Sequence, residues 1–292
     1  MPSGTAIAIA VALGAAAASL LVPRRIRPRA AAQLMTAFAV FSALAMIWAL
    51  FLVAAAGVAQ LHGVAERLSW CNDAVAGHSG VLAPSSAIAM LGLVAISASA
   101  WRVRRRQRQL RARAGDRELA IIGSETPTAF ALPGRPGQIV VSTAMLRALD
   151  ADERRALFAH ERAHLRCHHH RYVRLTQLAA ATFPVLDPLN ARVMLATERW
   201  ADEEAVRHVG SRDVVARAIA RAALLQADVP YSGLGIAGAG VLERVESLLQ
   251  GEQRRVLPVE YAFRVGALAA ATGLALSVVL VEPSIAAILR LC

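Results

Sequence analysis

The stretch "DADERRALFAHERAHLRCHHH", residues 150–170, carries the clearest structural signal in the chain. It opens with Asp150, a residue type that caps helices, and acidic residues fill the turn that follows. Alanine, leucine and phenylalanine then recur at helical spacing. Five of the chain's 8 histidines also lie here. The stretch therefore predicts an amphipathic helix that begins after Asp150 and carries a cluster of imidazoles.

Within this helix, His160, Glu161 and His164 form the pattern His-Glu-x-x-His. Residues four apart project from the same face of a helix, so both imidazoles can reach one metal ion. Glu161 follows the first histidine directly, where its carboxylate can hold a water molecule against that ion. The pattern predicts a catalytic metal site, and the ligand types favour zinc.

A catalytic zinc needs a third protein ligand and an open fourth position. We expect Glu198 to be that ligand, because it lies on a separate helix after a loop in which Pro184 and Pro188 let the chain double back. Asp202 is one turn further along the same face, where it could accept the N–H of a ligating histidine. The other downstream candidates are His168, His169, His170, Glu203, Glu204 and His208.

Most of these other groups have a simpler structural interpretation. His168 is expected at a solvated helix end, and His169 and His170 are expected to point elsewhere and to be exposed. His208 is expected near the end of its helix. Cys167 is expected to pack against neighbours, since two histidines and a carboxylate already supply the ligands.

The rest of the chain is too apolar for an ordinary soluble protein. Its 292 residues are 56% hydrophobic, with a mean hydropathy of +0.46. A helix needs about 20 apolar residues to cross a bilayer core. Four stretches predict such spans: about 6–22, 31–57, 83–101 and 265–281. The alternative for the third is a buried core helix. For the first it is a cleaved secretory signal, although arginines follow that stretch and none precedes it.

The distribution of charge predicts how the chain crosses the membrane. All 32 basic residues are arginines, against 21 acidic residues, and they cluster within 24–29 and 102–113. The positive-inside rule places both clusters in the cytoplasm, where they could also contact anionic lipid headgroups. We expect a multi-pass protein of the inner (cytoplasmic) membrane with its N-terminus outside. Direct nucleic-acid binding is not expected, because no helix-turn-helix or zinc-finger spacing accompanies the basic residues.

The predicted organisation has three parts. Residues 1–101 hold three transmembrane helices, residues 102–262 form one cytoplasmic α+β domain, and residues 263–292 hold a fourth transmembrane helix and a short external tail. The fold class is therefore a mostly α membrane protein with a cytoplasmic α+β domain. Cys71 and Cys292 would both face outward, and the sequence leaves their pairing open.

The cytoplasmic domain combines strands and helices. Short apolar runs separated by proline and glycine predict strands over 119–122, 129–132 and 139–142, with "PGRPG" as a turn. Further helices are expected over 191–209, 213–227 and 241–249. The glycine-rich segment 231–240 is expected to be a mobile loop.

At this level of detail the chain resembles a known family. "HERAH", followed after 33 residues by "ERWAD", resembles the gluzincin signature H-E-x-x-H…E-x-x-x-D. The segment "TAFALPGRPGQIVVSTAMLRAL" resembles the strand region of the membrane-embedded gluzincins, which include HtpX, the CAAX-prenyl proteases and the BlaR/MecR antibiotic-sensing receptors. Three spans before the peptidase domain and one after it are closest to the BlaR/MecR type. That type carries an extracellular penicillin-binding sensor after the last span, which is expected to be lacking here, since only about ten residues follow that span.

The resemblance implies a zinc metalloendopeptidase with one Zn²⁺ per chain. His160, His164 and Glu198 would hold the metal, Glu161 would be the catalytic base, and residues 128–132 would form the edge strand that pairs with the substrate. The substrate would be a cytoplasmic or membrane-adjacent protein, which in BlaR/MecR systems is a transcriptional repressor. The alternatives are HtpX-like quality control of membrane proteins and a catalytically silent membrane scaffold, and the intact Glu161 argues against the scaffold. Oligomeric state is left open, with a homo-oligomer among the options.

Overall fold

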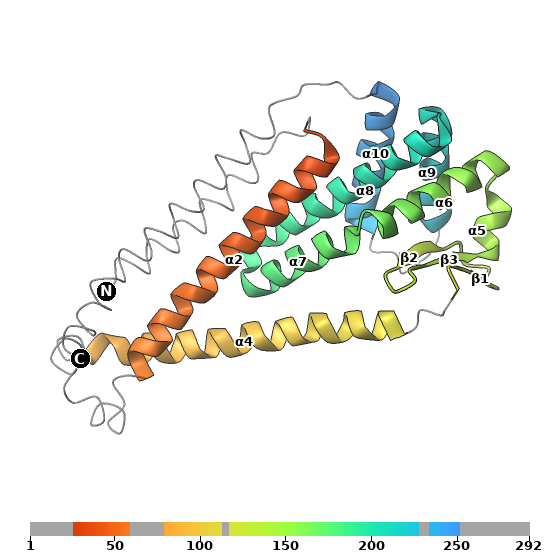
Figure 1. Ribbon diagram of the computed structural model, residues 1–292. Helices are drawn as coiled ribbons and strands as arrows, with labels where there is room; N and C mark the ends of the chain where they lie inside the picture. The colour runs from red at the N-terminus through yellow and green to blue at the C-terminus, as the bar shows by residue number, and fades with distance from the viewer. Residues whose placement is uncertain (1–25, 59–78, 113–116, 228–233, 252–292) are drawn as a thin grey trace.

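The computed structural model describes residues 26–58, 79–112, 117–227 and 234–251 of the chain. These residues are mostly helical, with one small mixed sheet (Figure 1). The predicted spans at 6–22 and 265–281 lie outside the described residues, as do Cys71 and Cys292.

Two long helices make up the apolar part of the structure, α2 (Pro28–Val58) and α4 (Ser79–Ala112). Both are long and apolar enough to cross a membrane. They contain the second and third predicted spans, and α4 continues without a break from the third span into the arginine-rich run. The two helices meet at the end of α2 and the start of α4, and they diverge toward the rest of the molecule as a V (Figure 1).

The three predicted strands are confirmed: β1 (Leu119–Ile122), β2 (Ala129–Leu132) and β3 (Gln138–Ser142). Their order is β1-β3-β2, with β3 parallel to β1 and antiparallel to β2. All residues of β3 are buried, as expected for the central strand. Within the described part of the chain, β2 is therefore an edge strand, and it is joined to β3 by the predicted "PGRPG" turn.

Helix α5 (Thr143–Ala148) follows the sheet, and α6 (Ala151–Arg166) carries the His-Glu-x-x-His pattern. The predicted cap at Asp150 is confirmed. Asp150 accepts a hydrogen bond from the backbone N–H of Glu153 at 2.8 Å, and Glu153 accepts one from the backbone N–H of Asp150 at 3.0 Å. Such a reciprocal capping box is worth about 1 kcal/mol and fixes where the helix begins.

Helix α6 ends earlier than the sequence suggested, and a second helix follows. His168 adopts a left-handed conformation with φ 55°, so the chain turns there before α7 (His169–Thr182) begins. The short 3₁₀ turn η3 (Pro184–Leu186) leads into α8 (Asp187–Val209), which begins four residues before the predicted 191. Pro188 lies in the first turn of α8, where proline is well tolerated.

The antiparallel helices α7 and α8 pack against the first half of α2. One hydrophobic cluster joins the three helices, and Trp200 of α8 belongs to it. The part of the chain that follows the sheet is therefore not merely tethered to α2 but shares a core with it. The buried members of this hydrophobic cluster are Ile26, Ala30, Ala31, Ala32, Met35, Ala39, Ala43, Ala179, Ala180, Leu186, Leu189, Val193, Ala196 and Trp200.

Helices α9 (Arg212–Ala227) and α10 (Leu234–Gln250) complete the fold. The prediction of a loop over 231–240 is wrong for residues 234–240, which form the start of α10. Each glycine costs a helix about 1 kcal/mol relative to alanine, which is why the segment looked irregular. Packing compensates for this cost, because α10 lies on α8 and α9, with Gly240 near Leu195 and Leu248 fully buried.

Candidate metal centre

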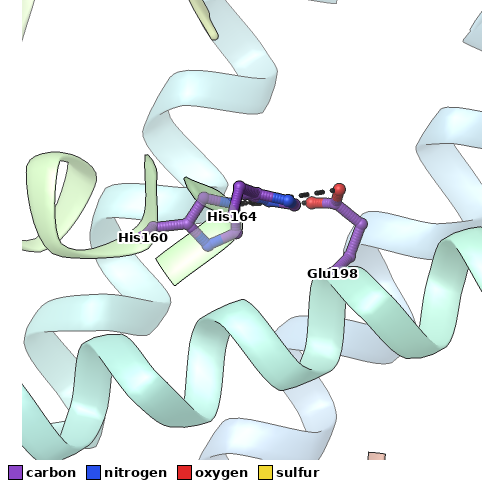
Figure 2. Close-up of side chains that lie close together, drawn as sticks. All are labelled: His160, His164 and Glu198. Atoms are coloured by element: carbon purple, nitrogen blue, oxygen red, sulfur yellow. Dashed lines mark hydrogen bonds and ion pairs between the residues drawn. The ribbon is translucent and has the colours of Figure 1, made fainter. Parts of the chain in front are cut away.

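His160, His164 and Glu198 converge on one point (Figure 2). The two histidines lie one turn apart on α6, and the carboxylate comes from α8. The Nε2 atoms of His160 and His164 are 3.0 Å apart, and they lie 3.4 and 3.5 Å from the nearest Glu198 oxygens. Ligands of a tetrahedral zinc lie about 3.3–3.6 Å from one another, given metal–ligand bonds of about 2.0–2.2 Å. The three side chains could therefore hold one metal ion.

The charge around this point also suits a divalent cation. Three carboxylates lie here, those of Glu161, Glu198 and Asp202, against one guanidinium, that of Arg244. With the carboxylates ionised and the histidines neutral, the site carries a surplus of two negative charges. Buried charges need a partner or a metal, so a dication would balance the site.

The pKa values of the three converging groups follow from burial and from these charges. Burial alone would lower the pKa of His160, but its contacts with Asp202 and Glu198 raise it to about 10. Burial lowers the pKa of His164 to about 4. Burial would raise the pKa of Glu198, but the neighbouring histidines and Arg244 hold it well below its usual range. The site thus keeps Glu198 ionised and draws positive charge to Nε2 of His160, where a metal would compete with a proton.

A carboxylate lies behind the first histidine. Oδ1 of Asp202 is 2.9 Å from Nδ1 of His160, on the side of the ring away from Glu198. Arg244 of α10 donates two hydrogen bonds of 2.8 Å to Asp202, and its third nitrogen lies 3.2 Å from Glu198. Sequence reasoning missed Arg244, and no local signal in the sequence marks it.

We expect Arg244→Leu to destabilise the domain by about 3–5 kcal/mol, because Asp202 is only 1% exposed and would keep a buried carboxylate without its main counter-charge. The thermal unfolding of the purified protein in detergent measures this. Arg155→Leu is the matched control, since it removes an ion pair whose two side chains are both exposed and should cost less than about 1 kcal/mol. Equal losses in the two variants would contradict the structural role of Arg244.

A third histidine lies behind His164. Nδ1 of His169 lies 3.1 Å from Nδ1 of His164, and the His169 ring packs 4.6 Å from that of Trp200. Burial lowers the pKa of His169 to about 3, so the ring is neutral and can accept the N–H of His164. That hydrogen bond leaves Nε2 of His164 free for a metal.

The prediction that His169 is exposed is wrong, and so is the one for His170, which is half-buried. The reason is the turn at His168, which starts a new helix and directs His169 back toward α6. His168 itself is exposed and no longer follows the face of His164.

The remaining candidates are engaged elsewhere. Glu203 pairs with Arg212 at 2.9 Å, and Glu204 contacts Arg166 at 2.6 Å and Arg207. The expectations for two further groups are confirmed. His208 is exposed in the last turn of α8, and Cys167 packs against the helical core.

A cavity of about 460 Å³ borders the converging groups. Strand β2 forms one side of it, and apolar residues of α6 and α9 form another. Glu161 lines the cavity and is itself buried, which raises the pKa of its carboxyl to about 7. A carboxyl group in this range can take up and release protons near neutral pH. A candidate metal site, a carboxyl group that can act as a base and an edge strand beside one cavity suit the metal-assisted hydrolysis of a peptide.

Comparison with known proteins agrees with this chemistry. Residues 102–246 match the model of peptidase family M48, and this stretch contains the three converging side chains, Glu161 and Arg244. Family M48 consists of zinc metallopeptidases that are often bound to membranes, so the match supports a metallopeptidase. No curated protein and no solved structure matches the chain.

Proposed function

We propose that this chain, whose residues 102–246 match the family M48 peptidases, is an integral-membrane zinc endopeptidase. The observation that carries the proposal is the convergence of His160, His164 and Glu198, with donor atoms 3.0–3.5 Å apart, beside the buried Glu161. These three residues would hold one Zn²⁺. When bound, zinc acidifies a water molecule and polarises the peptide carbonyl.

The protein's own residues would supply the remaining steps. Glu161 would accept the proton of the attacking water and pass it to the leaving amine nitrogen. Asp202 and His169 would each hold one ligand ring in the tautomer that presents Nε2, and Arg244 would fix the positions of Asp202 and Glu198. None of these supporting residues needs to touch the substrate.

The substrate would bind as an extended peptide along β2. The outer edge of this strand is not paired with another described strand, and residues 129–131 of β2 line the cavity. Main-chain hydrogen bonds to an edge strand would hold the peptide across the site, with one of its side chains in the apolar part of the cavity. This arrangement favours an unstructured segment of a protein over a folded one.

Helices α2 and α4 would be two of the membrane spans, and residues 102–262 would form the cytoplasmic domain. The arginine runs within 24–29, around the start of α2, and within 102–113, at the end of α4, support this orientation. The N-terminus would then lie outside, and the protein would be located in the inner membrane. A cytoplasmic or membrane-adjacent protein is the substrate class that follows. Cleavage of a transcriptional repressor, as the BlaR/MecR resemblance implies, is our proposal for its regulatory role.

Quality control of membrane proteins, as in HtpX, is the second candidate. The part of the cavity formed by α9 is favourable to it, since that wall consists of alanine, valine and isoleucine and would accept many apolar side chains. Profiling the peptides released from a bacterial membrane fraction separates the two functions. One dominant cleaved protein supports regulation, whereas many misfolded proteins support quality control.

Removal of the metal tests the proposed activity directly. Treatment of the purified protein with 1,10-phenanthroline should reduce cleavage of an unfolded fluorogenic substrate to background, and one equivalent of Zn²⁺ per chain should restore it. Metal analysis of the same samples gives the stoichiometry. Proteolysis that continues in metal-free protein would overturn the proposal.

A further inference from the structure

Helices α7 and α8, with η3 between them, form a helical hairpin over residues 169–200 that lies beside α2. The buried residues of α8 in the shared cluster recur every three or four positions, as do those of α2 from Ala32 to Ala43. Figure 1 shows the hairpin in the opening of the V, next to the first half of α2 and above α4. Contacts of α7 with both α2 and α4 agree with this view.

The position of the hairpin along α2 indicates how deep the hairpin would lie in a membrane that α2 spans. Arg29, the last charged residue before the apolar part of α2, lies over the Trp200 ring at 5.5 Å, at the open end of the hairpin. From there, the shared core extends along α2 to Ala43. At 1.5 Å per residue this is about 20 Å of helix, which matches one leaflet of a bilayer, with about 15 Å of core and about 5–7 Å of headgroup region. If α2 spans the membrane, the closed end of the hairpin lies at the level of the cytoplasmic leaflet.

The composition of the hairpin also changes from its open end to its closed end. Arginines lie toward the open end at positions 171, 174 and 199, and at 192, three residues past the closed end, whereas Asp187 is the one ionisable residue within 175–191. Asp187 lies in the first turn of α8, where the helix amides offset a negative charge. Arginines at such a boundary can extend toward headgroups while the segment beyond them stays apolar.

Two threonines at or near the closed end are hydrogen-bonded within the hairpin, whereas Asp187 is exposed. Thr176 donates a hydrogen bond of 2.8 Å to the Asn190 side chain, which joins α7 to α8, and Thr182 donates one of 2.9 Å to the backbone carbonyl of Leu178. Internal pairing of this kind is what a hydrocarbon environment requires. Apolar side chains, by contrast, point outward: Val185 is 48% exposed at the tip, and Leu175 is 44% exposed.

We propose that the closed end of the hairpin, residues 178–189, is embedded in the cytoplasmic leaflet, where lipid acyl chains cover Val185. The inference rests on the membrane-spanning role of α2 in the proposed function, but not on catalysis. It has a consequence for the substrate, because the same two helices carry His169 and Glu198 near their other end. The metal centre is then held at a fixed, short distance from the membrane surface, so juxtamembrane segments are the peptides within its reach.

Depth-dependent fluorescence quenching tests the proposal in the full-length protein. Single cysteines are introduced at Val185, Leu175, Leu44 and Leu224 in a chain whose native cysteines are replaced by alanine, and each is labelled with bimane before reconstitution into phosphatidylcholine vesicles. Leu44 of α2 is 59% exposed and reports on the proposed span, and Leu224 of α9 is 70% exposed and reports on water. The quenchers are doxyl-labelled lipids in the bilayer and iodide in the aqueous phase.

We expect the Val185 label to be quenched by doxyl lipids and protected from iodide, like the Leu44 label, while the Leu224 label shows the opposite. The Leu175 label should respond to a shallower doxyl position than the Val185 label. A Val185 label quenched by iodide, or protected from both quenchers because protein covers it, overturns the proposal. If doxyl lipids quench the Leu44 label but not the Val185 label, this inference alone is wrong. If they quench neither label, the proposed span of α2 is wrong as well. Peptidase activity, measured in the same vesicles, reports separately on the proposed catalysis.

Discussion

Replacing Glu161 with glutamine is expected to reduce proteolysis by about 10²–10⁴-fold, the usual contribution of a general base. Glutamine has nearly the same shape but cannot accept the proton of the attacking water. Zinc should stay bound, because the converging donor atoms belong to His160, His164 and Glu198 and not to Glu161. Initial rates on an unfolded protein substrate, together with zinc content, measure both outcomes.

Glu203→Gln is the matched control for this variant. Glu203 is also a carboxylate on a helix near the site, but it pairs with Arg212 and does not line the cavity. Its variant should retain the wild-type rate. A wild-type rate in Glu161→Gln would remove Glu161 from the mechanism. An inactive wild-type protein that nevertheless binds zinc would instead favour the catalytically silent scaffold.

The parts of the fold that the sequence predicted well depend on short-range patterns. The strands followed from apolar runs interrupted by proline and glycine, and the start of α6 followed from Asp150 and Glu153, which meet across one helical turn. His160 and His164 could be paired for the same reason, since two side chains four residues apart in a helix lie on the same face.

The parts that it missed depend on contacts between distant segments. Nothing local distinguishes Arg244 from an exposed arginine, and it becomes a buried partner of Asp202 only because α10 packs on α8. The glycines within 234–240 likewise lower helix propensity, and packing outweighs this effect. The turn at His168 buries His169, which a continuous helix would have left exposed.

The apolar helices illustrate a further limit. A run such as α2 predicts a membrane span, but hydropathy cannot tell which side chains face lipid and which face protein. In the structure, Ala32 and Ala39 are buried against the hairpin, whereas Leu44 and Phe51 are exposed. Leu34 and Met35 are buried as well and Ala37 is exposed, so side-chain size alone does not mark the face that contacts the domain.

Replacing His160 with alanine is expected to remove zinc and proteolysis together, because only two of the three protein ligands would remain. The loss of zinc affinity in this variant can be compared with that of a second variant at the same site. Asp202→Asn keeps all three ligands but weakens the support behind His160, which typically reduces zinc affinity by about 10–100-fold. The His160→Ala loss should exceed that range, and competition with a fluorescent zinc chelator measures both.

Two further variants separate a metal centre from a network of ion pairs. Glu198→Ala should behave like His160→Ala, whereas Glu204→Ala, which removes a carboxylate of the same helix that contacts Arg166 and Arg207, should keep the full zinc content. If the histidines and Glu198 were only hydrogen-bonded to one another, all of these variants would lose stability without changing the metal content. Equal zinc in the wild type and in His160→Ala would therefore end the assignment, whatever the effect on activity.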